Sequence, residues 1–130
     1  MSKRKLIIID DHRIIRDGLK AIFKRNKNFE VVADFDNEEQ LLNFLRINDA
    51  ELILMDIHLN TGNGIEISRN VKTEFPHVRI LMHTMSDDPY NINEAKKIGC
   101  EGYVLKSSGQ KELENALDVV SNGGIFYVKG

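Results

Sequence analysis

The sequence predicts an α/β fold: a doubly wound parallel sheet of five strands with five helices. Short apolar, β-rich runs alternate with longer segments of helical periodicity along the chain, and this alternation is typical of a parallel sheet covered on both faces. The runs at 6–9, 52–55 and 78–83 are nearly continuously apolar, as buried central strands should be. At 130 residues, the chain has room for one domain of this kind.

The five predicted strands occupy residues 6–9, 31–35, 52–55, 78–83 and 103–105. The second of these carries Asp34 in its middle, which suits a strand at the edge of the sheet. Each strand is followed by a helical segment whose apolar residues lie three or four positions apart: Ile15, Leu19, Ile22 and Phe23; Leu41, Leu42 and Leu45; Ile65 and Val71; Ile92, Ala95 and Ile98; Leu113, Ala116, Leu117 and Val120.

Caps, prolines and glycines mark where the predicted helices begin and end. Asn37 is a candidate N-cap for the second helix. Pro89, with Asp87 or Asp88 as the cap, opens the fourth helix, which stops at Gly99. Residues 1–124 therefore form the predicted domain, and residues 125–130 either pack back on it or begin a linker or tail.

Composition and charge exclude several classes of protein. Hydrophobic residues make up 42% of the chain, which excludes a disordered segment. The net charge of −2 argues against direct nucleic-acid binding by this domain. Cys100 is the only cysteine, so no internal disulfide can form, and a reducing compartment is favoured.

The N-terminus has a superficial similarity to a signal peptide, because basic residues precede an apolar run. That run, Leu6 to Ile9, is four residues long, too short for a signal core or a membrane span. We therefore expect a soluble cytoplasmic protein without a membrane anchor.

Polar side chains stand at the end of four predicted strands: Asp10 and Asp11, Asp56, Thr84, and Lys106. The carboxyl ends of parallel strands meet at one edge of the sheet, where ligands of such folds bind. Each residue has a structural explanation, since Asp after a strand is commonly a helix N-cap and a terminal Thr or Lys is commonly structural or solvated. Four strands ending in this way favour a functional site.

The residue types at this edge suggest a cation and phosphoryl chemistry. Carboxylates crowded together repel each other, and a hard divalent ion such as Mg²⁺ relieves that repulsion. Asp56 next to a cation and Lys106 could attack a phosphoryl group and hold the resulting acyl phosphate. The cation, Lys106 and the Thr84 hydroxyl could then share the charge of the phosphoryl oxygens.

With these motifs, the sequence resembles the receiver domain of two-component response regulators, which has a CheY-like, flavodoxin-like fold. The resemblance covers about residues 4–123, and it implies a strand order of 2-1-3-4-5. The matching motifs, in order, are Ile9-Asp10-Asp11-His12, Leu54-Met55-Asp56-Ile57, Gly64, Leu81-Met82-His83-Thr84 and Gly102-Tyr103-Val104-Leu105-Lys106.

The resemblance implies a role for each residue of the predicted site. Asp56 is the implied phosphoacceptor, and Lys106 pairs with the phosphoryl group. Asp11 is the implied direct ligand of Mg²⁺ or Mn²⁺, Asp10 acts through a water molecule, and the backbone carbonyl of His58 completes the protein's share of the metal shell.

The resemblance also implies a switch and a means of tuning its lifetime. Thr84 moves toward the phosphoryl group, and the rotamer of Tyr103 is coupled to that movement. His58 and Ser86 are the implied tuning residues, because they line the path of the hydrolytic water. For His58, a solvated loop histidine is an equally good explanation.

Three positions depart from the common pattern of the family. Asn60 stands where Pro is frequent, which predicts a more mobile loop. Met85 follows the switch threonine, where a small residue is usual, and it could narrow access to Asp56. Ser107 replaces Pro after Lys106, which leaves the geometry of that peptide bond open.

The resemblance implies partners as well. The phosphoryl donor is a phosphohistidine on a sensor histidine kinase. The last helix and tail are similar to the NarL/FixJ subfamily, in which a helix-turn-helix DNA-binding domain follows. No such domain is present in these 130 residues, so the chain is either an excised domain or a stand-alone receiver.

In this family the surface of the fourth helix, fifth strand and fifth helix often mediates dimerisation. Charged residues on that surface of the present chain are Lys96, Lys97, Glu101, Lys111 and Glu114. A mixed charge pattern of this kind is also what an ordinary solvated face carries.

The sequence thus predicts a non-enzymatic, phosphorylation-operated switch with a transcriptional output. One alternative is a degenerate receiver that acts as a constitutive interaction module. The other is a small Mg²⁺-dependent aspartyl phosphohydrolase. Such enzymes place a second Asp two residues after the nucleophile, and here that position is His58.

Overall fold

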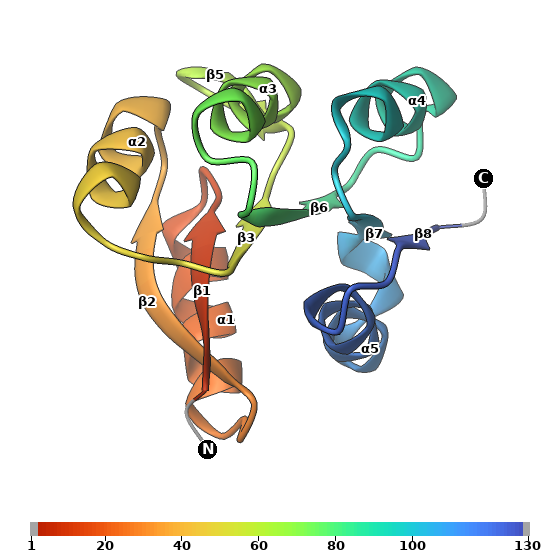
Figure 1. The fold of residues 1–130 in the computed structure, drawn as a ribbon. Helices are drawn as coiled ribbons and strands as arrows, with labels where there is room; N and C mark the ends of the chain where they lie inside the picture. The colour runs from red at the N-terminus through yellow and green to blue at the C-terminus, as the bar shows by residue number, and fades with distance from the viewer. Residues whose placement is uncertain (1–2, 129–130) are drawn as a thin grey trace.

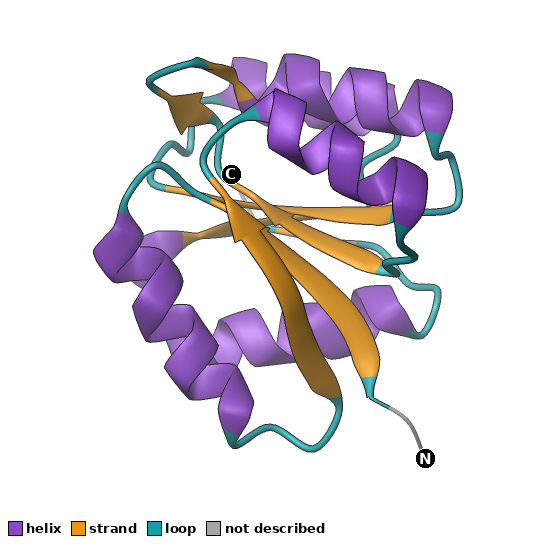
Figure 2. Cartoon of the chain, turned by 90° about the vertical axis from the view of Figure 1, so that its left-hand side faces the viewer, coloured by secondary structure: helices purple, strands orange, loops and turns teal. Residues whose placement is uncertain are grey.

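The computed structural model describes residues 3–128, which form three layers (Figures 1 and 2). A central parallel sheet has the strand order β2-β1-β3-β6-β7-β8. Helices α2, α3 and α4 cover one face of this sheet, and α1 and α5 cover the other (Figure 1). The elements in chain order are β1 Arg4–Ile9, α1 Arg13–Lys24, β2 Phe29–Phe35, α2 Glu38–Ile47, β3 Leu52–Met55, β4 His58–Leu59, β5 Gly62–Asn63, α3 Gly64–Glu74, β6 Arg79–Thr84, α4 Pro89–Ile98, β7 Gly102–Leu105, the 3₁₀ turn Lys106–Ser108, α5 Gln110–Ser121 and β8 Phe126–Tyr127.

The predicted fold class is confirmed. The five predicted strands are β1, β2, β3, β6 and β7, and their spatial order is the expected 2-1-3-4-5. Two features were not predicted: β4 and β5 form a small antiparallel hairpin, and β8 adds a sixth strand to the sheet.

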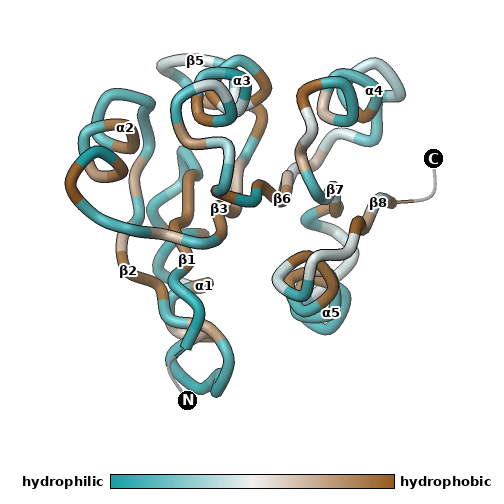
Figure 3. Tube along the Cα trace, in the orientation of Figure 1, coloured by the Kyte–Doolittle hydropathy of each residue, from teal (hydrophilic) through white to brown (hydrophobic). Residues whose placement is uncertain are grey.

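The core has two halves because successive strand residues face opposite sides of the sheet. In β1, Leu6 and Ile8 pack toward α1 and α5, whereas Ile7 and Ile9 pack toward α2, α3 and α4. All four side chains are fully buried, and the strands are correspondingly apolar in Figure 3. This double-sided burial explains why the central strands are continuously apolar in the sequence.

Asp34, the acidic residue in the middle of the edge strand β2, forms ion pairs with α1. The Asp34 carboxylate lies 2.8 Å from Arg16 Nε and 3.1 Å from Lys20 Nζ, both on α1. Partial burial raises the pKa of Asp34, but hydrogen bonds from Lys20 and Arg16 outweigh it and hold that pKa below its usual range. The acidic side chain therefore joins α1 to the edge of the sheet.

Side-chain caps fix the helix starts that the sequence predicted. The Asn37 side chain accepts a hydrogen bond from the Gln40 N–H, so it caps α2. Asp88 rather than Asp87 caps α4, and Pro89 occupies the first turn of that helix. Gly99 ends α4 with a φ of 92°, a left-handed conformation that glycine adopts without strain.

The segment after α5 packs back on the sheet. The N–H of Phe126 donates to Glu101 O and the N–H of Val128 donates to Tyr103 O, at 3.0 and 2.9 Å. The Tyr127 ring stacks on the Tyr103 ring with centroids 6.2 Å apart, and its hydroxyl donates to Cys100 O. Strand β8 therefore covers the edge of β7, and residues 129 and 130 lie outside the described residues.

Two further expectations concern the backbone and the membrane. Among residues 3–128 no peptide bond is cis, so the Lys106–Ser107 bond is trans. No helix within the described part of the chain combines the length and the apolar content that a membrane crossing requires.

Candidate functional site

The predicted site residues stand at one edge of the sheet because their strands run in parallel. Asp10 directly follows β1 and Asp56 directly follows β3. These strands are neighbours, with Ile9 opposite Met55, and the N–H of Asp56 donates to Ile9 O at 2.9 Å. The register of the sheet therefore brings the two carboxylates together.

Lys106, at the end of β7, joins these two carboxylates. Its Nζ lies 2.7 Å from Asp10 Oδ2 and 2.9 Å from Asp56 Oδ2. The side chains of Lys106, Asp10 and Asp56 are only 10%, 2% and 6% exposed. Burial lowers the pKa of Lys106, but hydrogen bonds to both carboxylates outweigh it and raise that pKa overall. The lysine is therefore held as an ammonium ion beside Asp56.

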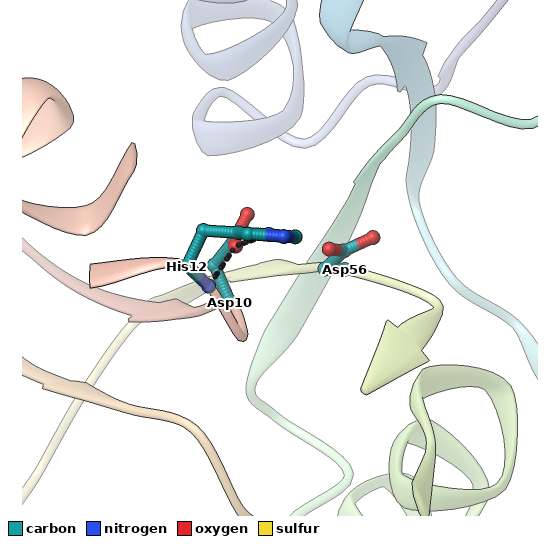
Figure 4. Close-up of side chains that lie close together, drawn as sticks. All are labelled: Asp10, His12 and Asp56. Atoms are coloured by element: carbon teal, nitrogen blue, oxygen red, sulfur yellow. Dashed lines mark hydrogen bonds and ion pairs between the residues drawn. The ribbon is translucent and has the colours of Figure 1, made fainter. Parts of the chain in front are cut away.

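Asp10, His12 and Asp56 form the group of potential metal ligands (Figure 4). One ligand atom from each residue lies within 4.8 Å of the others. The Asp10 Oδ1 also accepts the backbone N–H of His12 at 2.8 Å, and it lies 3.4 Å from His12 Nδ1. Two carboxylates and an imidazole are a donor set that fits a divalent cation.

The other predicted metal ligands stand outside this group. Asp11 follows Asp10 and is partly exposed, and it does not belong to the cluster formed by the described side chains. His58 begins β4 with its side chain exposed. The direct coordination expected of Asp11 and of the His58 carbonyl stays a prediction.

Gly64 fixes the distance between α3 and the predicted phosphoacceptor. A Cβ atom at this position would lie 1.9 Å from the Asp56 carbonyl oxygen, far inside any real contact. The Gly64 N–H donates to Ile57 O at 2.7 Å, and the Asn63 side chain caps α3 by accepting from the Ile65 N–H. The backbone at Asp56 is therefore packed directly against the first turn of α3.

The loop that contains Asn60 forms the turn of the β4–β5 hairpin. His58 pairs with Asn63 and Leu59 pairs with Gly62. At the tip, the Thr61 hydroxyl donates to Asp36 O at 3.2 Å, which ties the hairpin to the end of β2. Leu59 packs against the core below it.

The predicted switch residues are both inside the protein. Thr84 is fully buried, and its Oγ1 accepts the Ser86 N–H at 3.4 Å. Tyr103 is also fully buried, and its hydroxyl donates to Ser86 O in the loop before α4. Burial raises the pKa of Tyr103 to about 12, so the hydroxyl keeps its proton. Thr84 and Tyr103 thus contact the same loop residue from two strands.

Ser86 and Met85 occupy different environments in that loop. The Ser86 Oγ accepts from the Asn91 side chain at 3.2 Å and from the Asp88 N–H at 3.3 Å. It is therefore engaged with the start of α4. Met85 is 69% exposed, so its side chain extends into solvent.

The residues of the predicted dimerisation surface make contacts within the chain. Glu101 pairs with Lys72 at 2.7 Å and accepts the Ile80 N–H. Lys96 Nζ lies 5.2 Å from the centre of the Tyr127 ring. Lys111 and Lys97 are exposed. Strand β8 covers the β7 part of this surface.

Two histidines near the site were not singled out from the sequence. His12 occurs in a matching motif, and its place directly after two aspartates was the available signal. His83 ends an apolar strand and is 8% exposed. Burial and the positive charge of Lys106 lower the pKa of His83 to about 4, so this imidazole is neutral at physiological pH.

Comparison with known proteins finds relatives that are transcriptional regulatory proteins. Transcriptional regulatory protein DegU of Brevibacillus brevis is 34% identical over 125 residues, which cover 96% of this chain and 53% of that protein. Transcriptional regulatory protein RcsB of Escherichia coli is 29% identical over 129 residues, covering 97% and 60% of the two chains. The chain thus spans little more than half the length of these curated relatives.

Solved structures agree with this relationship. The isolated REC domain of RcsB from Salmonella enterica serovar Typhimurium, solved in the presence of the phosphomimetic BeF₃⁻, has a TM-score of 0.89 at 27% identity, with 98% of this chain and 95% of that chain covered. A LuxR-family two-component response regulator from Aurantimonas sp. SI85-9A1 has a TM-score of 0.90 at 29% identity, with coverages of 96% and 89%. The profile of the response regulator receiver domain matches residues 6–118. The chain therefore belongs to the response regulator receiver domain family.

Proposed function

We propose that this chain is a phosphorylation-operated switch whose phosphoacceptor is Asp56. The observation that carries the proposal is the contact of Lys106 Nζ with the buried carboxylates of Asp56 and Asp10. A carboxylate held next to a fixed ammonium group can act as a nucleophile toward phosphorus, and the ammonium then offsets the charge of the product.

In the proposed reaction, an oxygen of Asp56 attacks the phosphorus of a phosphohistidine on a sensor histidine kinase. A P–O bond forms as the P–N bond breaks, and the leaving imidazole nitrogen keeps the electron pair. Lys106 pairs with a phosphoryl oxygen. Asp10, Asp11, Asp56 and the His58 carbonyl would hold Mg²⁺ or Mn²⁺, which offsets charge on the phosphoryl oxygens.

The switch follows from the added charge and acceptor oxygens of the phosphoryl group. Thr84 moves toward the phosphoryl group, and Tyr103 follows into the vacated space. Because Thr84 and Tyr103 both contact Ser86, their movement changes the loop before α4. His58 and Ser86 tune the lifetime of the phosphorylated state in this proposal.

The proposed output is the control of transcription through a DNA-binding domain outside these residues. Relatives named as transcriptional regulatory proteins support this. In this proposal residues 1–124 are the receiver, and residues 125–130 begin a linker or tail whose strand β8 packs back on the sheet. The location is cytoplasmic, and the protein is not an enzyme.

Intact-mass spectrometry tests the proposed function. The protein is incubated with Mg²⁺ and a small acyl phosphate. We expect one added phosphoryl group on the wild-type protein and none on the Asp56→Asn variant. A folded wild-type protein that gains no phosphoryl group would identify a constitutive interaction module, and continuous turnover of small phosphoesters would identify a phosphohydrolase.

A further inference from the structure

His12 is placed next to the phosphoacceptor by its own backbone. It stands immediately before α1, in an extended conformation with φ −97° and ψ 113°. Its backbone N–H donates to Asp10 Oδ1 at 2.8 Å, and the ring Nδ1 lies 3.4 Å from the same oxygen. The imidazole makes no side-chain capping bond to α1, and its ring extends from Asp10 toward Asp56 (Figure 4).

The Asp10 carboxylate divides its two oxygens between two partners. Lys106 contacts Oδ2 of Asp10 and Oδ2 of Asp56. The His12 ring contacts Oδ1 of Asp10 instead. Lys106 and a cation on the His12 side can therefore use different oxygens of the Asp10 carboxylate at the same time.

We infer that His12 is a ligand of the divalent cation at this site, and that it makes the site prefer imidazole-binding metals such as Co²⁺, Ni²⁺ and Zn²⁺ over Mg²⁺. The inference rests on the cation site of the proposed function and adds its metal selectivity. The ligand atoms of Asp10, His12 and Asp56 lie within 4.8 Å of one another, a cluster that one ion can draw together.

The selectivity follows from ligand chemistry. Mg²⁺ prefers oxygen ligands and keeps several of its waters, so a ring nitrogen adds little to its binding. Ions such as Co²⁺ and Ni²⁺ bind imidazole well, and their affinities rise along the Irving–Williams order. Removing His12 should therefore weaken the binding of these ions while leaving the carboxylates for Mg²⁺.

Calorimetric titration with Co²⁺ and with Mg²⁺ tests the inference on the complete chain. For His12→Gln we expect Co²⁺ affinity to fall about tenfold or more, the scale at which single groups around a metal act. Mg²⁺ affinity should change less than about twofold, because its oxygen ligands remain. The visible absorption spectrum of bound Co²⁺ should also change, since it reports nitrogen coordination. An unchanged ratio of the two affinities would overturn the inference.

Two matched variants separate His12 from the other exposed histidines. His77 is exposed and lies before β6, at the opposite end of the strands, so His77→Gln should leave both affinities unchanged. His58 is exposed on β4 near the site. If His58→Gln rather than His12→Gln removes the Co²⁺ preference, the assignment to His12 is wrong.

Folding and function are measured separately from metal choice. Circular dichroism and thermal unfolding of His12→Gln without metal should match the wild-type protein, because the ring is exposed and makes no capping bond. If His12→Gln does not fold, the wild-type protein is titrated with Co²⁺ while the magnetic resonance signals of the histidine rings are recorded. We expect the His12 ring signals to broaden at a lower Co²⁺ concentration than those of His77. Absence of phosphorylation with a retained Co²⁺ preference would contradict the proposed function and leave this inference standing.

Discussion

At the scale of single residues, His83 links stability to pH. Its imidazole is buried near Lys106, and its pKa is lowered to about 4 in the folded protein, against about 6.5 in an unfolded chain. Between these two values the unfolded chain binds a proton that the folded protein does not. The stability from this residue is therefore present above about pH 6.5 and is lost as pH falls toward 4.

The variant His83→Leu tests this linkage. Between pH 7 and pH 5, its unfolding free energy should fall by about 2 kcal/mol less than that of the wild-type protein. Urea unfolding at the two pH values measures the difference. His77→Leu, at an exposed position, serves as the control, and parallel pH profiles of His83→Leu and the wild type would contradict the explanation.

Individual site residues differ in how well sequence could place them. The positions of Asp10, Asp56 and Lys106 could be predicted because each directly follows a recognisable strand, and that of Thr84 because it is the last residue of one. The place of His12 was not, because it depends on the backbone hydrogen bond to Asp10 Oδ1. A hydrogen bond of that kind leaves no periodic signal in the sequence.

At the scale of elements, the length of a helix or strand decides whether the sequence can predict it. The long strands and helices can be predicted from the periodicity of their apolar residues, and the caps at Asn37 and Asp88 from their residue types. The hairpin β4–β5 and strand β8 have two residues in each strand, too few to show any period. Strand β8 forms because β7 supplies its hydrogen-bond partners, whereas β4 and β5 pair with each other.

Strand β8 should contribute measurably to stability through Tyr127. Its ring stacks on Tyr103, and its hydroxyl donates to Cys100 O. We expect Tyr127→Phe to lose about 1 kcal/mol of unfolding free energy with that hydrogen bond, and Tyr127→Ala to lose about 2–3 kcal/mol as packing is lost too. Chemical denaturation measures both.

Tyr90→Phe provides the matched control for Tyr127. Tyr90 lies on α4 and is 68% exposed, so losing its hydroxyl should leave stability within about 0.5 kcal/mol. Equal effects of the two Tyr→Phe changes would show that the hydrogen bond from the Tyr127 hydroxyl to Cys100 O adds nothing measurable to stability.

At the scale of the whole molecule, parallel topology accounts for what the sequence predicted about the site. Strand ends gather at one edge whatever their separation in the chain, so Asp56 and Lys106 meet although 50 positions separate them. Topology leaves open which atoms touch. The bridging position of Lys106 between two carboxylates depends on side-chain geometry that only the folded protein supplies.

At this scale the family resemblance also implies dimerisation on phosphorylation, through the surface of α4, β7 and α5, of which β8 covers the β7 part. We expect sedimentation of the protein with Mg²⁺ and beryllium fluoride, a phosphoryl mimic, to show a dimer, and the untreated protein a monomer. Asp56→Asn with the same additions should stay monomeric. An unchanged mass of the wild-type protein would argue against switching by dimerisation through this surface.

The missing side chain of Gly64 has a mechanical consequence. Because even one methyl group would collide with the Asp56 carbonyl oxygen, there is no room for a side chain between the Asp56 backbone and the first turn of α3. A displacement of that carbonyl toward the helix cannot be absorbed by an intervening side chain, since none is there. We therefore expect the α3 helix and the Asp56 backbone to move together as one rigid part.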